Sequence, residues 1–583
     1  MNTEQALLKL RESIREPGSV LALTGLMGTS SAWLIARLLK SVNHPILWVT
    51  SLQKEAEQVA SDLSFFSDFP VLLYPCHDSL PFVPLLPSTE TISQRISTLY
   101  RLATEDGPVV AVAPAQALVE LTVPPEILLN HVEYLQKGEE VDREKLLKWF
   151  IDSGYEHCAI VQSRGEFSIR GGLLDIFPPL TALPVRIDFF GDFVEEMRLF
   201  DPLTQRSTED LNELVILPAN ELIFSRSMLE SIHEKLVERA AKYNLPARRV
   251  HEILQQLEAR RLVEGYEALL PLFYPKPASV LDYIPQQTPL LIDRPEEVKR
   301  ALENYWKGAE QTYESAINEH RVFSSLESLL SDPEQLSKQI RDHTCWLFQD
   351  INLYGSLPNS SITKSKGSSF NLPVPNIQDL EIKSSKPDLT LMLGSAKRGI
   401  DLIGPVLDRL KDWIEAGERI VLVVPGQRQG QRMIELLSYH ELISDKARPS
   451  ILSAPLTNDP AKPELMICTG QLSSGFALPG EAYIVLTEEE LLGARAGRTR
   501  SPGREKTTVS DLTFEDLKPG QPIVHRDHGV GLYKGLVRIE TGGVPGEFLF
   551  LEYRGGDKLY LPVDRLGLVQ KYIGIEGRVL RRF

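Results

Sequence analysis

The stretch SVLALTGLMGTSSAWLIARLLK, residues 19–40, decides the first fold of this chain. It reads as an apolar strand, a turn that contains glycine, and a segment with the apolar spacing of a helix. Further short β-rich runs at 46–51, 71–75 and 109–114 alternate with helix-like segments. Apolar strands that alternate with helices are typical of a parallel sheet covered by helices, so we predict an α/β domain that begins with residues 1–124.

The same stretch has the setting of a phosphate-binding loop, G-x-x-x-x-G-K-[ST], in which backbone N–H groups, the lysine and the hydroxyl serve the phosphates and magnesium. It aligns with that pattern through Gly25 and Gly28, but Ser31 stands in place of the lysine and Ala32 in place of the hydroxyl residue. No intact copy of the pattern occurs elsewhere in the sequence. The groups that neutralise charge during phosphoryl transfer are therefore missing from this loop.

The acidic half of such a site is altered as well. A strand that holds magnesium would end in Asp-Glu, whereas the predicted strand at 288–293 ends in Asp293 and continues with Arg294. We therefore expect a helicase-like nucleotide fold that does not hydrolyse nucleotide. Binding of an anion through backbone N–H groups alone stays open, because helix N-termini attract anions.

The rest of the chain changes character several times, which predicts a multidomain α/β protein. Short runs broken by Gly-Gly, Pro-Pro and Gly-Asp indicate a small α+β module, and a Ser-, Gly- and Lys-rich segment indicates a linker. Strand patterns at 389–393, 419–424, 464–469 and 482–487 predict a second α/β domain. A β-rich end with tight turns predicts a small all-β, barrel-like domain.

The expected order is an α/β domain in two parts around an inserted α+β module, then a linker, a second α/β domain, a basic linker and the all-β domain. Their ranges are 1–124, 125–212 and 213–335 for the first domain with its insert, then 355–372, 375–490, 493–510 and 511–575. The sequence indicates no role for the second α/β domain.

The charge of the chain limits its partners. The 583 residues include 63 Lys and Arg against 79 Asp and Glu, a net charge of −16. Such an acidic chain is a poor non-specific binder of nucleic acid, because phosphate contacts depend on clustered cations. One segment, 495–506, reads either as a solvated linker or as an arm that contacts DNA weakly; its cations are Arg495, Arg498, Arg500, Arg504 and Lys506.

No apolar run approaches the ~20 residues that span a bilayer, and the N-terminus lacks the pattern of a signal peptide. The four cysteines lie far apart, so neither a disulfide framework nor a CxxC metal site is expected. Cys76, His77 and Asp78 are adjacent in the sequence, which does not make a catalytic triad, because such partners meet in space. We expect a cytoplasmic protein without a metal or a membrane partner.

Several stretches resemble one family. Those that resemble the first half of the excision-repair protein UvrB, and more closely the UvrB-like module of transcription-repair coupling factors, are YPCHDSLPFVPLLPSTETISQRISTLYRL (74–102), GEFSIRGGLLDIFP (165–178), LPVRIDFFGDFVEEMRLFDPLTQRS (183–207) and ILPANEL (216–222). The C-terminal segments PIVHRDHGVGLYKGL and GEFLFLEYRGGDKLYLPVDRLGLVQKYIG are similar to the CarD-type domain of that family, which interacts with RNA polymerase. The two signatures in this order resemble the N-terminal, non-motor part of the family.

The resemblance implies a UvrA-binding role for the module at 125–212. The matching positions are Arg170 in SIRGG, and Arg186 and Phe190 in PVRIDFF. Arginine offers paired hydrogen bonds and an exposed phenylalanine offers apolar area, as at many binding hot spots. The alternation in RIDFF leaves open whether Phe190 lies at the surface or fills the core of the module.

The resemblance also implies that the C-terminal domain binds the β subunit of RNA polymerase. Two β-rich runs, VRIETGG and EFLFLEY, suit the addition of a partner strand to an exposed edge. The expected contact is Ile539, flanked by Arg538 and Glu540. A register shift of one residue would turn Ile539 into the barrel, so its direction stays open.

The expected function is an adaptor that binds UvrA and RNA polymerase and so couples stalled transcription to excision repair. In the family an ATP-dependent motor follows these domains, and the sequence ends at IEGRVLRRF before such a motor. We therefore expect no catalytic residue, ATP or magnesium in this chain. The alternatives are a helicase-like ATPase or translocase fragment, which Ser31, Ala32 and Arg294 argue against, and a DNA-binding structural protein, which the net charge argues against.

Overall fold

The structure, a computed structural model, describes residues 2–349 apart from short gaps at 86, 225, 244, 259–264 and 323. Beyond residue 349 it describes 370, 372, 379–385, 387, 404–440, 442, 451–452, 465–492, 522–525, 529–541, 544–552, 558–562 and 569–571. The chain divides into two compact units, Met1–Gly497 and Arg498–Phe583.

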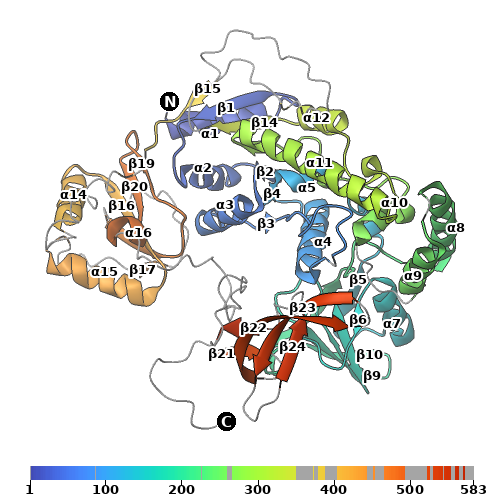
Figure 1. Ribbon diagram of the computed structural model, residues 1–583. Coiled ribbons are helices and arrows are strands. Elements are labelled where there is room, and N and C mark those ends of the chain that lie inside the picture. Colours follow the sequence, from blue (N-terminus) through green and yellow to red (C-terminus); the bar gives the residue numbers. More distant parts are fainter. Residues whose placement is uncertain are drawn as a thin grey trace. The chain divides into compact units, whose positions relative to one another are not determined.

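A seven-stranded parallel sheet lies at the centre of the N-terminal half of the first unit (Figure 1). Its order is β15-β1-β14-β13-β2-β4-β3. The strands are β1 Val20–Thr24, β2 Ile46–Thr50, β3 Val71–Leu73, β4 Val110–Pro114, β13 Leu290–Asp293, β14 Cys345–Gln349 and β15 Asp379–Glu381. The strands predicted at the beginning of the chain and at 288–293 are confirmed, and the parallel α/β fold with them.

Two strands of this sheet differ from the sequence prediction. Strand β14 was not predicted, and it lies between β1 and β13, with Cys345 opposite both Val20 and Leu290. Strand β15 falls in the range predicted for the second α/β domain, 375–490, but it pairs with β1 as an edge strand of the first sheet. The sequence pattern did not reveal this, because a strand of three residues is too short to show a period.

Both faces of the sheet are buried, because successive residues of a strand point to opposite sides. In β2, Leu47 and Val49 enter one apolar core, whereas Ile46 and Trp48 enter another. The second core is covered by α1 Thr3–Ser13, α2 Ser30–Leu39 and α3 Gln53–Phe66. The first is covered by α4 Thr89–Thr104, α5 Ala115–Val119, α6 Pro125–Leu129, α8 Arg226–Tyr243, α9 Ala247–Glu258, α10 Leu270–Phe273, α11 Pro295–Asn318 and α12 Pro333–Asp342 (Figure 1).

The inserted module has the predicted α+β composition. Its main sheet has six strands in the order β11-β10-β9-β8-β7-β6, and a separate pair joins β12 to β5. Helix α7, Arg143–Asp152, packs on one face of the main sheet through Leu146 and Phe150. The strands are β5 Glu133–Gln136, β6 Glu156–His157, β7 Glu166–Arg170, β8 Leu173–Ile176, β9 Val185–Phe190, β10 Phe193–Phe200, β11 Ser207–Leu211 and β12 Glu213–Ile216.

The second α/β domain has a five-stranded sheet in the order β17-β18-β16-β20-β19. Its elements are α14 Gly404–Glu415, β16 Arg419–Val424, α15 Gln427–Tyr439, β17 Ile451–Leu452, β18 Leu465–Thr469, β19 Phe476–Leu478, β20 Tyr483–Thr487 and α16 Glu488–Leu492. The strands predicted at 419–424, 464–469 and 482–487 are confirmed. The strand predicted at 389–393 lies outside the described residues.

The second unit contains an antiparallel sheet in the order β24-β23-β22-β21-β25. Its strands are β21 Pro522–His525, β22 Gly529–Thr541, β23 Val544–Glu552, β24 Lys558–Pro562 and β25 Val569–Lys571. The β-rich prediction is confirmed, whereas closure into a barrel stays a prediction, because in the described part of this unit β24 and β25 are the two edges of the sheet.

The two predicted linkers fall mostly outside the described residues. This holds for 493–510 as a whole, with its basic segment, and for 355–369. The last residues of the range 355–372 are an exception: Phe370 is buried, and its ring centroid lies 6.3 Å from that of Trp306 in α11. The end of this predicted linker is thus part of the first core.

Candidate partner-binding face and the altered nucleotide site

One face of the six-stranded sheet is open to solvent where β9 turns into β10, whereas farther along that face Val161, Phe177 and Phe200 form a small buried core. In β9, Val185, Ile187 and Phe189 are buried against α7, and the residues between them point to the other side. Phe190, at the end of β9, has 78% of its surface exposed. The alternative that Phe190 fills the core of the module is therefore wrong, and this large apolar side chain is available for contact.

Arg170 and Arg186 converge on one carboxylate of that face, that of Asp175 in β8. Arg186 lies opposite Asp175 in the strand register and donates from Nε to Oδ1 at 2.7 Å and from Nη2 to Oδ2 at 2.9 Å. Arg170 donates from Nη2 to Oδ2 at 2.6 Å. We call these three residues the Asp175 cluster. Because the Asp175 carboxylate is buried, the two arginines are held in fixed directions.

The rest of the face is polar, with an apolar end. Arg186 also lies over the ring of Phe200 at 4.7 Å. Arg198 of β10 pairs with Asp188 and Glu196. Phe193 is exposed next to Phe190, its partner across the β9–β10 turn. The predicted residues thus share one surface that combines fixed cations with exposed aromatic rings, as in many protein-binding surfaces.

The three residues predicted to bind polymerase lie on β22. Arg538, Ile539 and Glu540 stand opposite Glu547, Gly546 and Pro545 of β23. Strand β21 pairs only with 529–532, so among the described residues this half of β22 has a strand on one side only. The edge strand expected from the sequence is present in the backbone. The side chains of 538–540 lie outside the described residues, and the direction of Ile539 stays a prediction.

The altered phosphate loop connects β1 to α2. Gly25 and Gly28 have φ of +78° and +60°, in the left-handed region that favours glycine. The N–H of Met27 donates to Oγ of Ser384 at 2.6 Å, and that hydroxyl donates to the carbonyl oxygen of Gly25 at 2.8 Å. A backbone N–H group of the loop, the usual ligand of a phosphate, is thus bound to a side chain of the same chain.

Beside this loop is a cavity of about 340 Å³. Ser31 and Ala32 line it together with Trp48 of β2, Asp293 and Arg294. It lies where strands β1, β2, β13 and β14 end, the usual place of a ligand in an open parallel sheet. Gly28 and Thr29 of the loop also line this cavity, and so do Ser473 and Ser474 of the second α/β domain.

Arg294 reverses the charge expected on the acidic side of such a site. Its guanidinium lies 2.7 Å from Oε1 of Glu55, 3.0 Å from Oε2 of Glu297 and 3.6 Å from Oδ2 of Asp293. Burial opposes the charge of Glu55, but hydrogen bonds from Ser51 and Arg294 outweigh it, so the pKa of Glu55 is lowered. These carboxylates already have a cation, and a magnesium ion would compete with Arg294 for them.

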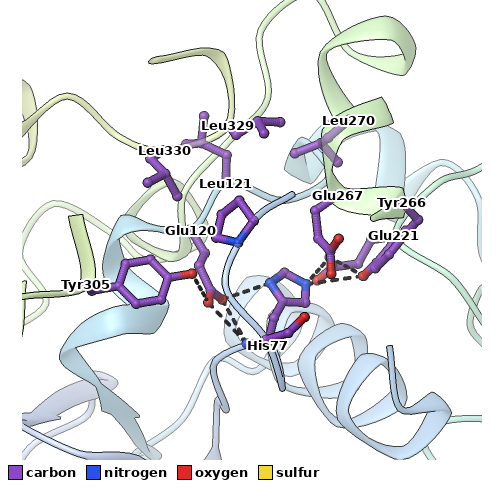
Figure 2. A pocket seen from close by; sticks show the side chains of 12 residues that line it. His77, Glu120, Leu121, Glu221, Tyr266, Glu267, Leu270, Tyr305, Leu329 and Leu330 are labelled. Atoms are coloured by element: carbon purple, nitrogen blue, oxygen red, sulfur yellow. Dashed lines mark hydrogen bonds and ion pairs between the residues drawn. The ribbon is translucent and has the colours of Figure 1, made fainter. Parts of the chain in front are cut away.

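A second group of charges is enclosed between the α/β domain and the exit of the inserted module (Figure 2). His77 lies between two carboxylates, with Nδ1 3.0 Å from Oε2 of Glu120 and Nε2 3.2 Å from Oε2 of Glu221. Arg95 of α4 donates to Glu221 at 2.7 Å and to Glu120 at 2.8 Å. Tyr305 donates to Glu120 at 2.8 Å. We call His77, Arg95, Glu120 and Glu221 the buried charge cluster.

The cluster balances two cations against two carboxylates. Burial and Arg95 oppose the charge of His77, but Glu120 and Glu221 outweigh them and raise its pKa to about 10. Burial disfavours the charge of Glu221, but Arg95 and His77 outweigh it and lower its pKa to about 2. The adjoining cavity measures about 20 Å³, room for about one water molecule. These groups therefore join parts of the fold and have no space for a substrate.

Sequence reasoning did not single out this cluster. In the sequence, His77 stands out only beside Cys76 and Asp78, with which it does not form a triad. The partners of His77 are instead Glu120 and, in the segment ILPANEL, Glu221. Arg95, a charge inside an apolar helix pattern, pairs with the same two carboxylates. A charged residue such as Arg95 in the middle of an apolar run indicates a buried ion pair. The sequence does not show which distant residue is its partner.

Two structural absences concern the described residues only. Among them, no group of three or more His, Cys, Asp and Glu side chains is placed to hold a metal ion. Over the same residues, the structure contains no helix with both the length and the apolar character needed to cross a membrane. Cys76, Cys158, Cys345 and Cys468, all among the described residues, form no disulfide.

Comparison with known proteins identifies two domains. Residues 134–222 match the UvrB interaction domain, and these residues form the inserted module with its open sheet. Residues 517–573 match the CarD-like/TRCF RID domain, and these include the antiparallel sheet of the second unit. The two domain types expected from the sequence are confirmed, in the expected order.

The relatives that match nearly all of this chain share one name. The chain is 30% identical to the transcription-repair-coupling factor of Myxococcus xanthus over 94% of its own length and 45% of that protein. It is 28% identical to that of Bacillus subtilis over 98% of its length and 46% of the relative, and 28% identical to that of Escherichia coli over 94% and 45%. The chain thus spans about half the length of these relatives. Over the part that it shares with them, this chain is similar to transcription-repair-coupling factors, and it contains a UvrB interaction domain and a CarD-like/TRCF RID domain.

Proposed function

We propose that this chain is an adaptor that binds UvrA through the open face of the six-stranded sheet and the β subunit of RNA polymerase through the C-terminal sheet. The observation that carries the proposal is that a UvrB interaction domain and a CarD-like/TRCF RID domain occur in one chain. The relatives are named for the coupling of transcription to repair. An adaptor needs two separate surfaces, and each domain supplies one.

The UvrA surface is proposed to centre on Phe190, Arg170 and Arg186. Phe190 offers exposed apolar area, and the two arginines are fixed by Asp175 before any partner arrives. Side chains that are already ordered lose little conformational entropy on binding. The two arginines share one carboxylate, so this cluster keeps a surplus positive charge that suits an acidic partner surface.

The polymerase surface is proposed to be the free edge of β22 near Ile539. A strand edge binds an extended partner through main-chain hydrogen bonds, and side chains beside it add specificity. Arg538 and Glu540 would pair with opposite charges of the partner, and Ile539 would fill an apolar pocket. The support is the backbone: this half of β22 pairs with β23 alone among the described strands.

The proposed mechanism is tethering. When one surface holds its partner, the other partner is recruited at an effective concentration set by the chain between the two domains. Neither step needs ATP or magnesium, which we propose only for the motor that the family resemblance implies. A helicase-like ATPase is the alternative, and Ser31, Ala32 and Arg294 argue against it.

Two further expectations are kept as proposals. The basic segment 495–506 lies outside the described residues, and a weak DNA contact there would show as binding that falls steeply with salt concentration. A cytoplasmic location is proposed from the four separate thiols, which suit a reducing compartment.

A bridging assay tests the adaptor directly. The β lobe of RNA polymerase is immobilised, the chain is added, and capture of UvrA is measured with and without ATP. We expect UvrA to be retained only when the chain is present, equally in both conditions. Phe190→Ala should abolish capture of UvrA while the chain itself still binds the β lobe, and Ile539→Arg should prevent binding of the chain.

The controls separate lost contacts from lost structure. Leu203→Ala changes a side chain that is 86% exposed in the same module, at the other end of the sheet, and should leave capture unchanged. If neither partner binds the chain, or if capture depends on ATP, the adaptor proposal is wrong. A dependence on ATP would instead favour the ATPase alternative.

A further inference from the structure

Two segments from the later part of the first unit reach the altered phosphate loop. One is the end of strand β15 and the residues after it, which bring Ser384 to Met27 and Gly25. The other is the turn before β19, where the carbonyl oxygen of Ser474 accepts a hydrogen bond at 2.8 Å from the hydroxyl of Thr29. The loop therefore contacts the second α/β domain, for which the sequence indicated no role.

The same turn is held from the neighbouring helix. In α3, Asp62 accepts hydrogen bonds from the N–H of Ser473 at 2.8 Å and from its hydroxyl at 2.6 Å. Burial raises the pKa of Asp62 to about 6, although the hydrogen bonds from Ser473 act in the other direction. Asp62 is buried at this contact, at one side of the cavity that Ser473 and Ser474 also line.

The turn 473–475 lies so close to the loop that position 28 requires glycine. A Cβ atom at Gly28 would collide with the carbonyl oxygen of Gly475 and come within 2.9 Å of Oγ of Ser474. In an ordinary phosphate loop, close approach of this kind belongs to the phosphate. Here the partner at that distance is the backbone of the second α/β domain.

Apolar side chains extend the contact between the first sheet's helices and the second α/β domain beyond the loop. Trp33 of α2 stacks on Tyr483 with ring centroids 5.7 Å apart and lies 5.8 Å from Phe476. Phe66 of α3 lies 6.2 Å from Phe476. One apolar core includes residues of α1–α3 and of β16, β18, β19 and β20. At its rim, Arg37 lies 3.5 Å from Glu481.

We propose that the altered phosphate loop is the docking site of the second α/β domain in this chain. Ser384 accepts from the N–H of Met27, Ser474 accepts from the hydroxyl of Thr29, and Gly475 fills the space over Gly28 where a phosphate would lie. The loop then fixes one domain on the other, and it does so with polar groups that a phosphate loop already presents. Loss of the lysine fits this use, because the loop faces a neutral hydroxyl and a carbonyl oxygen here instead of an anion.

Hydrogen exchange in the full chain tests this docking, with Gly28→Ala as the main variant. Gly171→Ala is the matched control, because Gly171 has φ of +63° against +60° for Gly28 but has no atom within 4 Å of an added Cβ. Both variants carry the same backbone strain. We expect exchange at the amides of Ser473 and Gly475 to rise about tenfold in Gly28→Ala relative to Gly171→Ala.

A variant that removes a single hydrogen bond, and the addition of ATP, complete the test. Thr29→Val keeps the side-chain shape and removes only the hydrogen bond to Ser474, so a smaller rise in exchange is expected in the same turn. ATP is then added to the unaltered chain, with no protection expected at residues 25–31. Equal exchange in Gly28→Ala and Gly171→Ala would contradict docking at the loop, and so would protection of residues 25–31 by ATP.

Discussion

The buried charge cluster and the Asp175 cluster use the same pairing of arginine with carboxylate in opposite settings. In the first, Arg95 is fully buried and shares two carboxylates with His77. In the second, two arginines share the single buried carboxylate of Asp175, and 49% of the Arg170 side chain is exposed. The enclosed cluster can only hold parts of the fold together, whereas the open one keeps charge available to a partner.

The two clusters also connect different parts of the molecule. The buried charge cluster connects α4 and the residue after α5 with Glu221, at the exit of the inserted module. The Asp175 cluster connects neighbouring strands within that module. Loss of the first should therefore destabilise the fold, and loss of the second should act mainly on the surface.

The largest effect is expected for Arg95→Met. It leaves Glu120 and Glu221 buried with only His77 as counter-charge, and breaking a buried ion pair from one side typically costs about 3–5 kcal/mol. Urea denaturation of the first unit measures this loss. The matched control is Arg101→Met on the same helix, whose partner Glu105 lies on the surface and whose loss should cost less than about 0.5 kcal/mol. Equal losses would mean that the cluster contributes little.

The pH dependence of stability should follow His77. Its folded pKa is raised to about 10, so its contribution is complete below the unfolded value of 6.5 and disappears as pH rises toward 10. Glu267, at the same cavity, has its pKa raised to about 7 by burial, so measurements above about pH 8.5 lie beyond most of its titration. Between about pH 8.5 and 10, the unfolding free energy of the unaltered chain should fall more steeply than that of His77→Gln. Parallel curves would show that His77 is neutral in the folded chain.

A smaller effect is expected in the Asp175 cluster. Arg186 makes a two-point contact and only 18% of its side chain is exposed, so Arg186→Ala should cost about 1–3 kcal/mol. Arg170→Ala removes a single contact at the surface and should cost less than about 1 kcal/mol. Thermal unfolding of the two variants compares them. The reverse order would mean that Arg170, and not Arg186, neutralises Asp175.

Much of the fold could be predicted from periodicity and turns. Strands β1, β2, β3, β4 and β13 of the first sheet and three strands of the second α/β domain follow apolar patterns that are local in the sequence, whereas β14 was not predicted. Strand β15 could not be predicted, because its place beside β1 depends on pairing with residues more than 350 positions away. The docking of the turn 473–475 on Gly28 is hidden for the same reason.

Some residues of the candidate sites could be predicted from the sequence and others could not. The changes at Ser31, Ala32 and Arg294 could be read directly, because a phosphate loop is a continuous pattern. The family resemblance pointed to Arg170, Arg186 and Phe190, but only the strand register shows that Asp175 holds both arginines and that Phe190 faces outward. Sequence alternation could not decide that direction, since RIDFF contains two adjacent aromatic residues.

The most direct test of the adaptor account measures the affinity of the chain for UvrA with Phe190→Ala and Leu203→Ala, together with their unfolding free energies. Both side chains are largely exposed, so each variant should change stability by less than about 0.5 kcal/mol. We predict that Phe190→Ala weakens binding by about 2 kcal/mol or more, as expected at a hot spot, and that Leu203→Ala leaves it unchanged. Equal affinities of the two variants for UvrA would contradict the account.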